Sequence, residues 1–309
     1  RAERLGFFEK VFSGEQTDAE VLTFLRGGLS FQDTDQEFPR DFLSRVKWKA
    51  PFPLIRHHFG LPTVRATVDG IEKIAEAKIL DVISLGLDQD AQENFFHPER
   101  QQLNRKGAGG VPVRHPEEFL EIYQASLAGN MPMLRSYSGT DDFIQMAKLL
   151  TETIHNAWCA IPLFWFNNMD GRGPWDLEGS IAQHQEVIKW YAERNIPVEI
   201  NEPHHWGMRD APDVIYVVAA YLSAYNAKHF GVKDYIAQFM FNSPPGMSDS
   251  MDLAKMLASL ELIKPLEEEN FKIWKQTRTG LLSYPTHLPK ARGHLSGSIY
   301  LQMALQPDI

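Results

Sequence analysis

The stretch Ile196-Pro197-Val198-Glu199-Ile200 decides the expected fold, because it reads as a short apolar strand that runs directly into Asn201-Glu202-Pro203-His204-His205-Trp206-Gly207. Polar, ionisable and aromatic side chains therefore crowd the point where a strand ends and a helix is about to begin. In a barrel of alternating strands and helices, the carboxyl ends of the strands converge on one rim, where active sites are built. Four other strand-like runs end in the same way, at Arg65, at Arg135-Ser136-Tyr137, at Asn167-Asn168-Met169-Asp170 and at Asn242-Ser243.

Strand-like and helix-like segments alternate along most of the chain. Amphipathic helical patterns separate most of the strand candidates, and parallel neighbouring strands need crossover connections of this kind. We therefore predict an α/β fold, a closed (β/α)8 TIM barrel rather than an open doubly wound sheet, over residues 61–309. An N-terminal helical extension is expected over residues 1–60. The strand candidates lie near 62–67, 79–85, 110–114, 131–137, 160–166, 197–202, 235–241 and 271–277.

Composition excludes several classes of protein. A formal net charge of −9 argues against nucleic-acid binding, which requires a basic face. No apolar run approaches the roughly 20 residues of a membrane span, and the first residues lack the apolar core of a signal peptide. The single cysteine, Cys159, cannot form an internal disulfide, which favours a reducing cytoplasm. We expect a cytoplasmic protein that binds neither nucleic acid nor a membrane.

Two arginines and one glutamate are the first candidates for a site. Arg65 and Arg135 each follow an apolar run, and guanidinium is a planar, permanently charged fork that suits carboxylates and phosphates. The alternative is that each arginine pairs with a rim carboxylate such as Asp88. Glu202, beside Asn201, is a candidate general base, hydrogen-bond acceptor or ion-pair partner.

His204 and His205 suggest a metal site, but the spacing argues against one. Adjacent side chains on an extended segment point to opposite faces, and no H-E-x-x-H or C-x-x-C motif accompanies them. We therefore predict no metal ligation, and expect one of the two histidines to line a site or contact a cofactor.

The order and content of these segments resemble the barrel subunit of glutamate mutase, also called methylaspartate mutase, over residues 60–305. Pro62-Thr63-Val64-Arg65 is similar to the first strand of that family, which ends in a substrate-binding arginine. Leu134-Arg135-Ser136-Tyr137-Ser138-Gly139-Thr140-Asp141 resembles the segment that supplies another such arginine. Ile200-Asn201-Glu202-Pro203 resembles the Ile-Asn-Arg-Glu-Pro segment, and Ser283-Tyr284-Pro285 falls where the family has a turn near the corrin.

The resemblance implies an isomerase, an intramolecular mutase that uses a radical from adenosylcobalamin (vitamin B12) to rearrange a small carboxylate substrate. Arg135 and Glu202 would then be the catalytic residues. Because the chain has no convincing cobalamin-binding motif, the resemblance also implies a small cobalamin-binding subunit or domain and a hetero-oligomer. It assigns substrate contacts to Arg65, Arg135, Tyr137, Trp165 and Asn201, and cofactor contacts to Thr67, His204 and Tyr284.

Departures from the family pattern leave the substrate open. Gln92 stands where a third substrate arginine would align, and the loop 167–173 is shorter than its counterpart. Three other functions fit the same residues: a barrel that transfers methyl groups to or from cobalamin, a metal-dependent hydrolase or lyase using His204 or His205, and a partner subunit without a working site.

Overall fold

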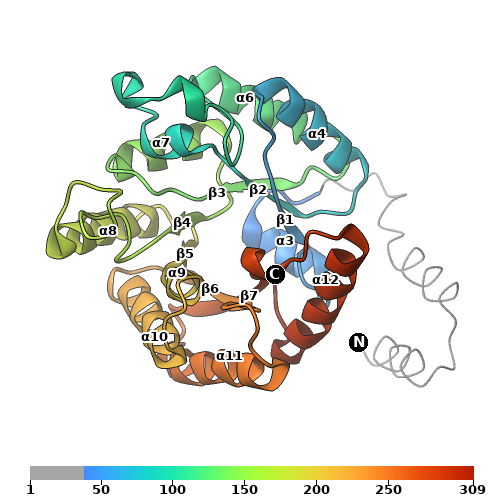
Figure 1. The fold of residues 1–309 in the computed structure, drawn as a ribbon, viewed down its shortest axis with the longest axis vertical. Helices are drawn as coiled ribbons and strands as arrows, with labels where there is room; N and C mark the ends of the chain where they lie inside the picture. The colour runs from blue at the N-terminus through green and yellow to red at the C-terminus, as the bar shows by residue number, and fades with distance from the viewer. Residues whose placement is uncertain (1–37) are drawn as a thin grey trace, which may run out of the picture.

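The computed structural model describes residues 38–309, which form an α/β fold built on parallel strands. One sheet has the order β1-β2-β3 and the other has the order β4-β5-β6-β7, and every pairing within them is parallel. Figure 1 shows these strands at the centre, with the long helices around them. The strands are β1 (Arg56–Phe59), β2 (Val82–Leu85), β3 (Met133–Ser136), β4 (Cys159–Ile161), β5 (Val198–Ile200), β6 (Asp234–Phe241) and β7 (Lys272–Thr279).

Seven long helices follow strands or strand-like segments, and shorter ones lie in the connections. None of the helices within residues 38–309 is long and apolar enough to cross a membrane. The helices are α3 (Phe42–Lys49), α4 (Val64–Glu76), α5 (Gln89–Glu93), α6 (Pro116–Ala125), α7 (Phe143–Thr153), α8 (Leu177–Ala192), α9 (Glu202–Gly207), α10 (Asp213–His229), α11 (Asp249–Ile263) and α12 (Leu288–Gln302).

Main-chain hydrogen bonds also join the edges of the two sheets. Between β3 and β4, the N–H of Ser138 donates to the carbonyl of Ala160 at 2.8 Å. On the other side, Asp308 lies between β7 and the start of β1: its N–H donates to the carbonyl of Lys275, and its own carbonyl accepts from the N–H of Leu54, both at 2.8 Å. The short segment around Asp308 therefore connects β7 to the residues that lead into β1.

Helix α3 contributes to the core at the amino ends of the strands. The ring of Phe42 lies edge-on to Trp158 and to Trp274, with ring centroids 5.4 Å apart in both pairs. Lys49 forms an ion pair with Asp81, and Arg45 Nη1 lies 3.6 Å from the same carboxylate. This packing fills the amino ends of the strands and leaves the carboxyl ends free for a site.

The structure corrects the predicted beginning of the sheet. The strand predicted over 62–67 is wrong, because helix α4 begins at Val64 and the hydroxyl of Thr63 caps it by accepting from the N–H of Ala66 at 3.2 Å. The first strand is β1, which lies before the expected domain boundary at residue 60. The strand predicted over 110–114 is reduced to a bridge between Leu87 and Val111, and that predicted over 160–166 ends at Ile161.

The other expected elements correspond to observed ones. The strands near 79–85, 131–137, 197–202, 235–241 and 271–277 are β2, β3, β5, β6 and β7. The helix within residues 38–60 is α3, and the part of the predicted extension before residue 38 lies outside the described residues.

The segment between β2 and α6 is long but tightly bonded. The carboxylate of Asp88 accepts from the backbone N–H of Gly107 at 2.9 Å and from the guanidinium of Arg114 at 2.7 Å. Asp90 accepts from the N–H of Gln102 at 2.8 Å and from Arg105 at 2.6 Å. These two buried carboxylates hold the segment in a fixed shape beside the carboxyl end of β2.

Candidate functional site

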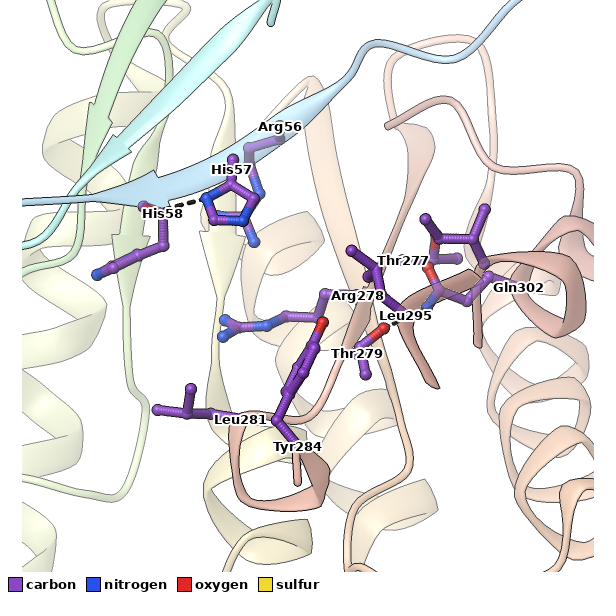
Figure 2. Close-up of a pocket in the computed structure, with 11 residues that line it drawn as sticks. Arg56, His57, His58, Thr277, Arg278, Thr279, Leu281, Tyr284, Leu295 and Gln302 are labelled. Atoms are coloured by element: carbon purple, nitrogen blue, oxygen red, sulfur yellow. Dashed lines mark hydrogen bonds between the residues drawn. The ribbon is translucent and has the colours of Figure 1, made fainter. Parts of the chain in front are cut away.

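Two adjoining cavities lie at the carboxyl ends of the strands and share the side chains of His58 and Arg278. The larger cavity, of about 480 Å³, opens between β1, β7 and α12 (Figure 2). Its lining includes Arg56, His57, Tyr284 and Leu281. The smaller cavity, of about 150 Å³, is lined by His58, Leu85, Gly86, Leu87, Gln92, Arg135, Tyr137, Asn201, His204, His205 and Arg278.

Three arginines from three strands line these two cavities. In Figure 2, Arg56 from β1 and Arg278 from β7 both reach into the larger cavity, and Arg135 from β3 lines the smaller one. Arg56 donates to the hydroxyl of Ser84 at 2.5 Å. Within residues 38–309, Arg278 lies within ion-pair distance of no carboxylate. The same is true of Arg56, so Arg135 is the one of the three that forms an ion pair with a carboxylate of the described residues.

Glu199 is the carboxylate that compensates the cluster. Its Oε1 accepts from Arg135 Nη2 at 2.5 Å, and its Oε2 accepts from the indole N–H of Trp158 at 2.6 Å. Burial alone would raise the pKa of Glu199, but the guanidiniums of Arg135 and Arg56 outweigh it and hold that pKa below its ordinary value. Glu199 is therefore ionised at neutral pH, and both of its oxygens are engaged.

The positive charges also act on one another. Burial lowers the pKa of Arg56 and of Arg278, and the charge of Arg135 lowers both further. Guanidinium nevertheless stays protonated in proteins. Three cations and one carboxylate leave a net charge of two positive units around the cavities.

His204 and His205 lie side by side, contrary to the expectation that they face opposite ways. They belong to the short helix α9, which has Pro203 in its first turn, and their ring centroids are 4.6 Å apart. The extended geometry assumed from the sequence is wrong at this point, so both rings line the smaller cavity.

Both imidazoles are held neutral. Burial is the largest cause, and it lowers the pKa of both His204 and His205 well below the ordinary value. The positive charge of Arg278 lowers the pKa of His204 further, and His204 lowers that of His205 further. Nδ1 of His204 bonds to the amide oxygen of Gln238, which can only accept, so this nitrogen carries the proton and Nε2 remains an acceptor. Nε2 of His205 lies 3.2 Å from the hydroxyl of Tyr137.

Glu202 is buried beside the site but does not line either cavity. Its Oε2 accepts from the N–H groups of Leu163 and Phe164, both at 2.8 Å, and so ties the segment after β4 to α9. Its Oε1 has no hydrogen-bond partner among the described residues. Burial raises the pKa of Glu202 to about 7. The carboxyl can hold or release a proton near neutral pH, but in this position it is first a structural link.

The other predicted site residues divide into two groups. Tyr137 and Asn201 line the smaller cavity and Tyr284 lines the larger one. Trp165 lines neither cavity and packs against Trp206, with ring centroids 5.0 Å apart. Arg65 lies on α4 with its side chain 85% exposed and paired with Asp69 at 3.0 Å. Thr67 is fully buried, and its hydroxyl donates to the carbonyl of Thr63 at 2.9 Å. The structure brings neither Arg65 nor Thr67 to the cavities, because the strand expected there is a helix.

Sequence reasoning missed Arg56 and Arg278. Arg56 lies in Arg56-His57-His58-Phe59, within the expected N-terminal extension, where no strand was predicted. Arg278 lies near the end of β7, where Trp274, Gln276 and Arg278 alternate with Lys275 and Thr277. Side chains of a strand alternate between its two faces, so this pattern places Arg278 on the inner face near the carboxyl end of the strand. That alternation is the signal from which Arg278 could have been predicted.

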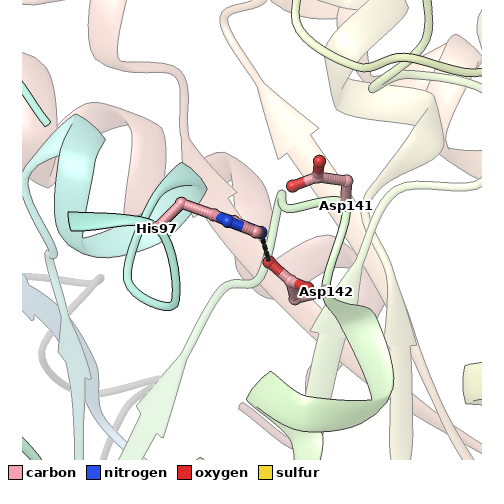
Figure 3. A group of neighbouring side chains, drawn as sticks. All are labelled: His97, Asp141 and Asp142. Atoms are coloured by element: carbon pink, nitrogen blue, oxygen red, sulfur yellow. Dashed lines mark ion pairs between the residues drawn. The ribbon is translucent and has the colours of Figure 1, made fainter. Parts of the chain in front are cut away.

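A separate cluster of possible metal ligands lies in the loops beyond the cavities. The ligand atoms of His97, Asp141 and Asp142 lie within 4.8 Å of one another (Figure 3). His97 Nε2 is 3.0 Å from Asp142, and Arg100 is 3.1 Å from Asp141. These groups already pair with neighbouring charges, so we interpret the cluster as an ion-pair network between two loops.

Comparison with known proteins assigns no role to these residues. No protein-family model matches the chain, and no curated protein matches it either.

Proposed function

We propose that the strands close into a (β/α)8 barrel. Support comes from the main-chain hydrogen bonds between β3 and β4, and from those that place Asp308 between β7 and Leu54. Seven paired strands together with this C-terminal segment make eight positions around the centre. The cavities then open at the carboxyl ends of the strands, which is where barrel enzymes carry their active sites.

We propose further that the chain is the catalytic barrel component of a cobalamin-dependent mutase that acts on a small carboxylate substrate. One observation carries the substrate class: Arg56, Arg135 and Arg278 line two adjoining cavities, and among the described residues Glu199 is the carboxylate that pairs with one of them. A surplus of positive charge in a partly buried site is costly without an anion, and guanidinium binds carboxylates through paired, charge-assisted hydrogen bonds. The reaction class rests on the resemblance of the chain to glutamate mutase.

The residues of the smaller cavity can orient such a substrate. Arg135 Nε is buried without a partner and Arg278 has no paired carboxylate, so both are available as donors. Neutral His204 offers an acceptor at Nε2, and Tyr137 lies opposite His205. Together these groups can hold an anion in one position.

The rim fits a broad and largely apolar group such as the corrin of cobalamin. Leu103, Met169, Leu281 and Leu282 are exposed on loops that follow the carboxyl ends of three strands, and Tyr284 lines the larger cavity. Tyr284, Leu281 and the exposed His57 are the residues that would contact the corrin, whereas buried Thr67 would not. When bound, adenosylcobalamin supplies the radical chemistry, while this chain binds and shields the substrate. A small cobalamin-binding subunit or domain would complete the site, in the cytoplasm.

Cobalamin titration tests this proposal. The purified chain would be titrated with adenosylcobalamin and with methylcobalamin, in the presence and absence of the cobalamin-binding protein from the same source, by calorimetry and corrin absorbance. We expect partner-dependent binding of adenosylcobalamin that weakens in Tyr284→Ala and is unchanged in Tyr300→Ala. Preference for methylcobalamin would instead favour methyl transfer, and binding of neither form would overturn a cobalamin-dependent function.

A further inference from the structure

Helix α10 presents an unusual face to solvent. Its inner face is buried through small side chains and Tyr216, but its outer face carries Val214, Val218 and Tyr225 with 64%, 46% and 48% of each residue exposed. Tyr221 lies between them, and its ring stacks on that of Tyr225 with centroids 6.2 Å apart. The spacing of residues 214, 218, 221 and 225 sets these side chains on one stripe.

The stripe is uncharged along almost the whole helix. No Asp, Glu, Lys or Arg occurs from Val214 to Ala227, although the helix lies on the outside of the molecule (Figure 1). By contrast, the exposed face of α4 carries Arg65, Glu72, Lys73 and Glu76. A helix that meets water normally has charged side chains there, so a contiguous apolar stripe marks an interaction surface.

We propose that this stripe, Val214, Val218, Tyr221 and Tyr225, binds the same stripe of a second copy of the chain in an antiparallel arrangement. The charges at the helix ends select this occupant and this direction. Asp213 begins the helix, and Lys228 and His229 end it. In the antiparallel arrangement Asp213 of each copy meets Lys228 of the other, whereas a parallel arrangement would bring like charges together.

The helix dipoles favour the same direction, because the positive end of one helix lies beside the negative end of the other. Asp213 also lies 3.4 Å from Lys255, and Lys228 lies 3.0 Å from Glu268. The contact between copies thus extends existing ion pairs and buries no lone charge. One surface serves both copies, as in a twofold symmetric dimer.

The size of the stripe sets the expected affinity. A helix of 17 residues is about 25 Å long, and one such helix from each copy gives an interface at the low end of the range for specific complexes. We therefore expect a reversible dimer with a dissociation constant of roughly 1–100 μM.

Sedimentation velocity on the full chain, from about 1 to 200 μM, tests the dimer. The chain should pass from monomer to dimer over this range. Val218→Glu, which puts a charge at the centre of the stripe, should raise the dissociation constant at least tenfold. The matched control Ile79→Glu, at an exposed apolar residue after α4, should leave it unchanged. A chain that stays monomeric throughout, or a dimer indifferent to Val218→Glu, would overturn the proposal.

Cysteine cross-linking tests the direction. In the antiparallel register Val214 of one copy faces Tyr225 of the other, while the two Val214 residues are about 16 Å apart along the helix axis, too far for a disulfide. Mixing Val214→Cys with Tyr225→Cys should give cross-linked dimers under oxidation, and Val214→Cys alone should give few. Efficient cross-linking of Val214→Cys to itself would contradict the antiparallel arrangement.

Discussion

Glu199 shows how single residues set the character of the site. It is the carboxylate among three guanidiniums, and its two oxygens are taken by Arg135 and Trp158. Glu199 therefore fixes the position of Arg135, and its single negative charge cannot balance all three guanidiniums. The positive surplus of the cavities therefore follows from which strand residues point inward, in a chain whose formal net charge is −9.

Glu202 predicts a dependence of stability on pH. Its pKa of about 7 in the folded state lies above the ordinary value of 4.5, so the folded state binds the proton more tightly than the unfolded state. The resulting stabilisation is complete below about pH 4.5 and is lost as the pH rises through 7, a change of about 3 kcal/mol.

Glu202→Gln isolates this effect, because the amide oxygen can still accept from Leu163 and Phe164 but cannot ionise. Urea unfolding from about pH 5 to pH 8 should show a smaller decline in the free energy of unfolding for the variant than for the wild-type chain. Equal declines would show that Glu202 does not titrate in this range.

At the scale of elements, the sequence predicted most helices and five of the strands in the right places. Long amphipathic helices such as α7 and α8 can be predicted from the sequence, because the face that must be buried carries apolar residues at helical spacing. Strand β1 was not predicted, because Arg56-His57-His58-Phe59 is too polar to be distinguished from a loop by its sequence alone. As a result, the first strand was predicted over residues 62–67, and Arg65 rather than Arg56 was expected to reach the site.

Contacts between residues far apart in the chain could not be predicted from the sequence either. Glu199 and Trp158 stand 41 positions apart, and nothing in either segment indicates that the indole donates to the carboxylate. Arg135, Tyr137 and Asn201 were found because each closely follows a strand or lies at its end, where barrel geometry alone predicts convergence.

Helix α3 should be essential to the amino end of the strands. Phe42→Ala removes the ring that packs between Trp158 and Trp274 and leaves a cavity there, which should lower the free energy of unfolding by about 3–5 kcal/mol. Leu103→Ala, at a largely exposed side chain, should change it by less than about 0.5 kcal/mol. Denaturant unfolding measures both, and similar values for the two variants would mean that α3 is not part of the folded core.

At the scale of the whole molecule, closure of the barrel depends on the segment around Asp308. If the strands form a closed ring, the N–H groups of Leu54, Thr277 and Ile309 are hydrogen-bonded on the inside of the fold and should exchange as slowly as those of β6. Hydrogen exchange read by NMR tests this directly. Exchange of these amides within the time typical of a frayed end would argue for two separate sheets.

The proposed binding of a small carboxylate depends on the arginine cavities, and calorimetric titration with succinate tests it most directly. The wild-type chain should bind this dicarboxylate, and Arg278→Gln should weaken binding roughly tenfold to a hundredfold, because a charge-assisted hydrogen bond contributes about 1.5–3 kcal/mol. Arg65→Gln makes the same chemical change on the exposed face of α4 and should bind as the wild type does. Absence of binding by the wild-type chain, or equal binding by Arg278→Gln, would contradict the assignment of these cavities to an anionic substrate.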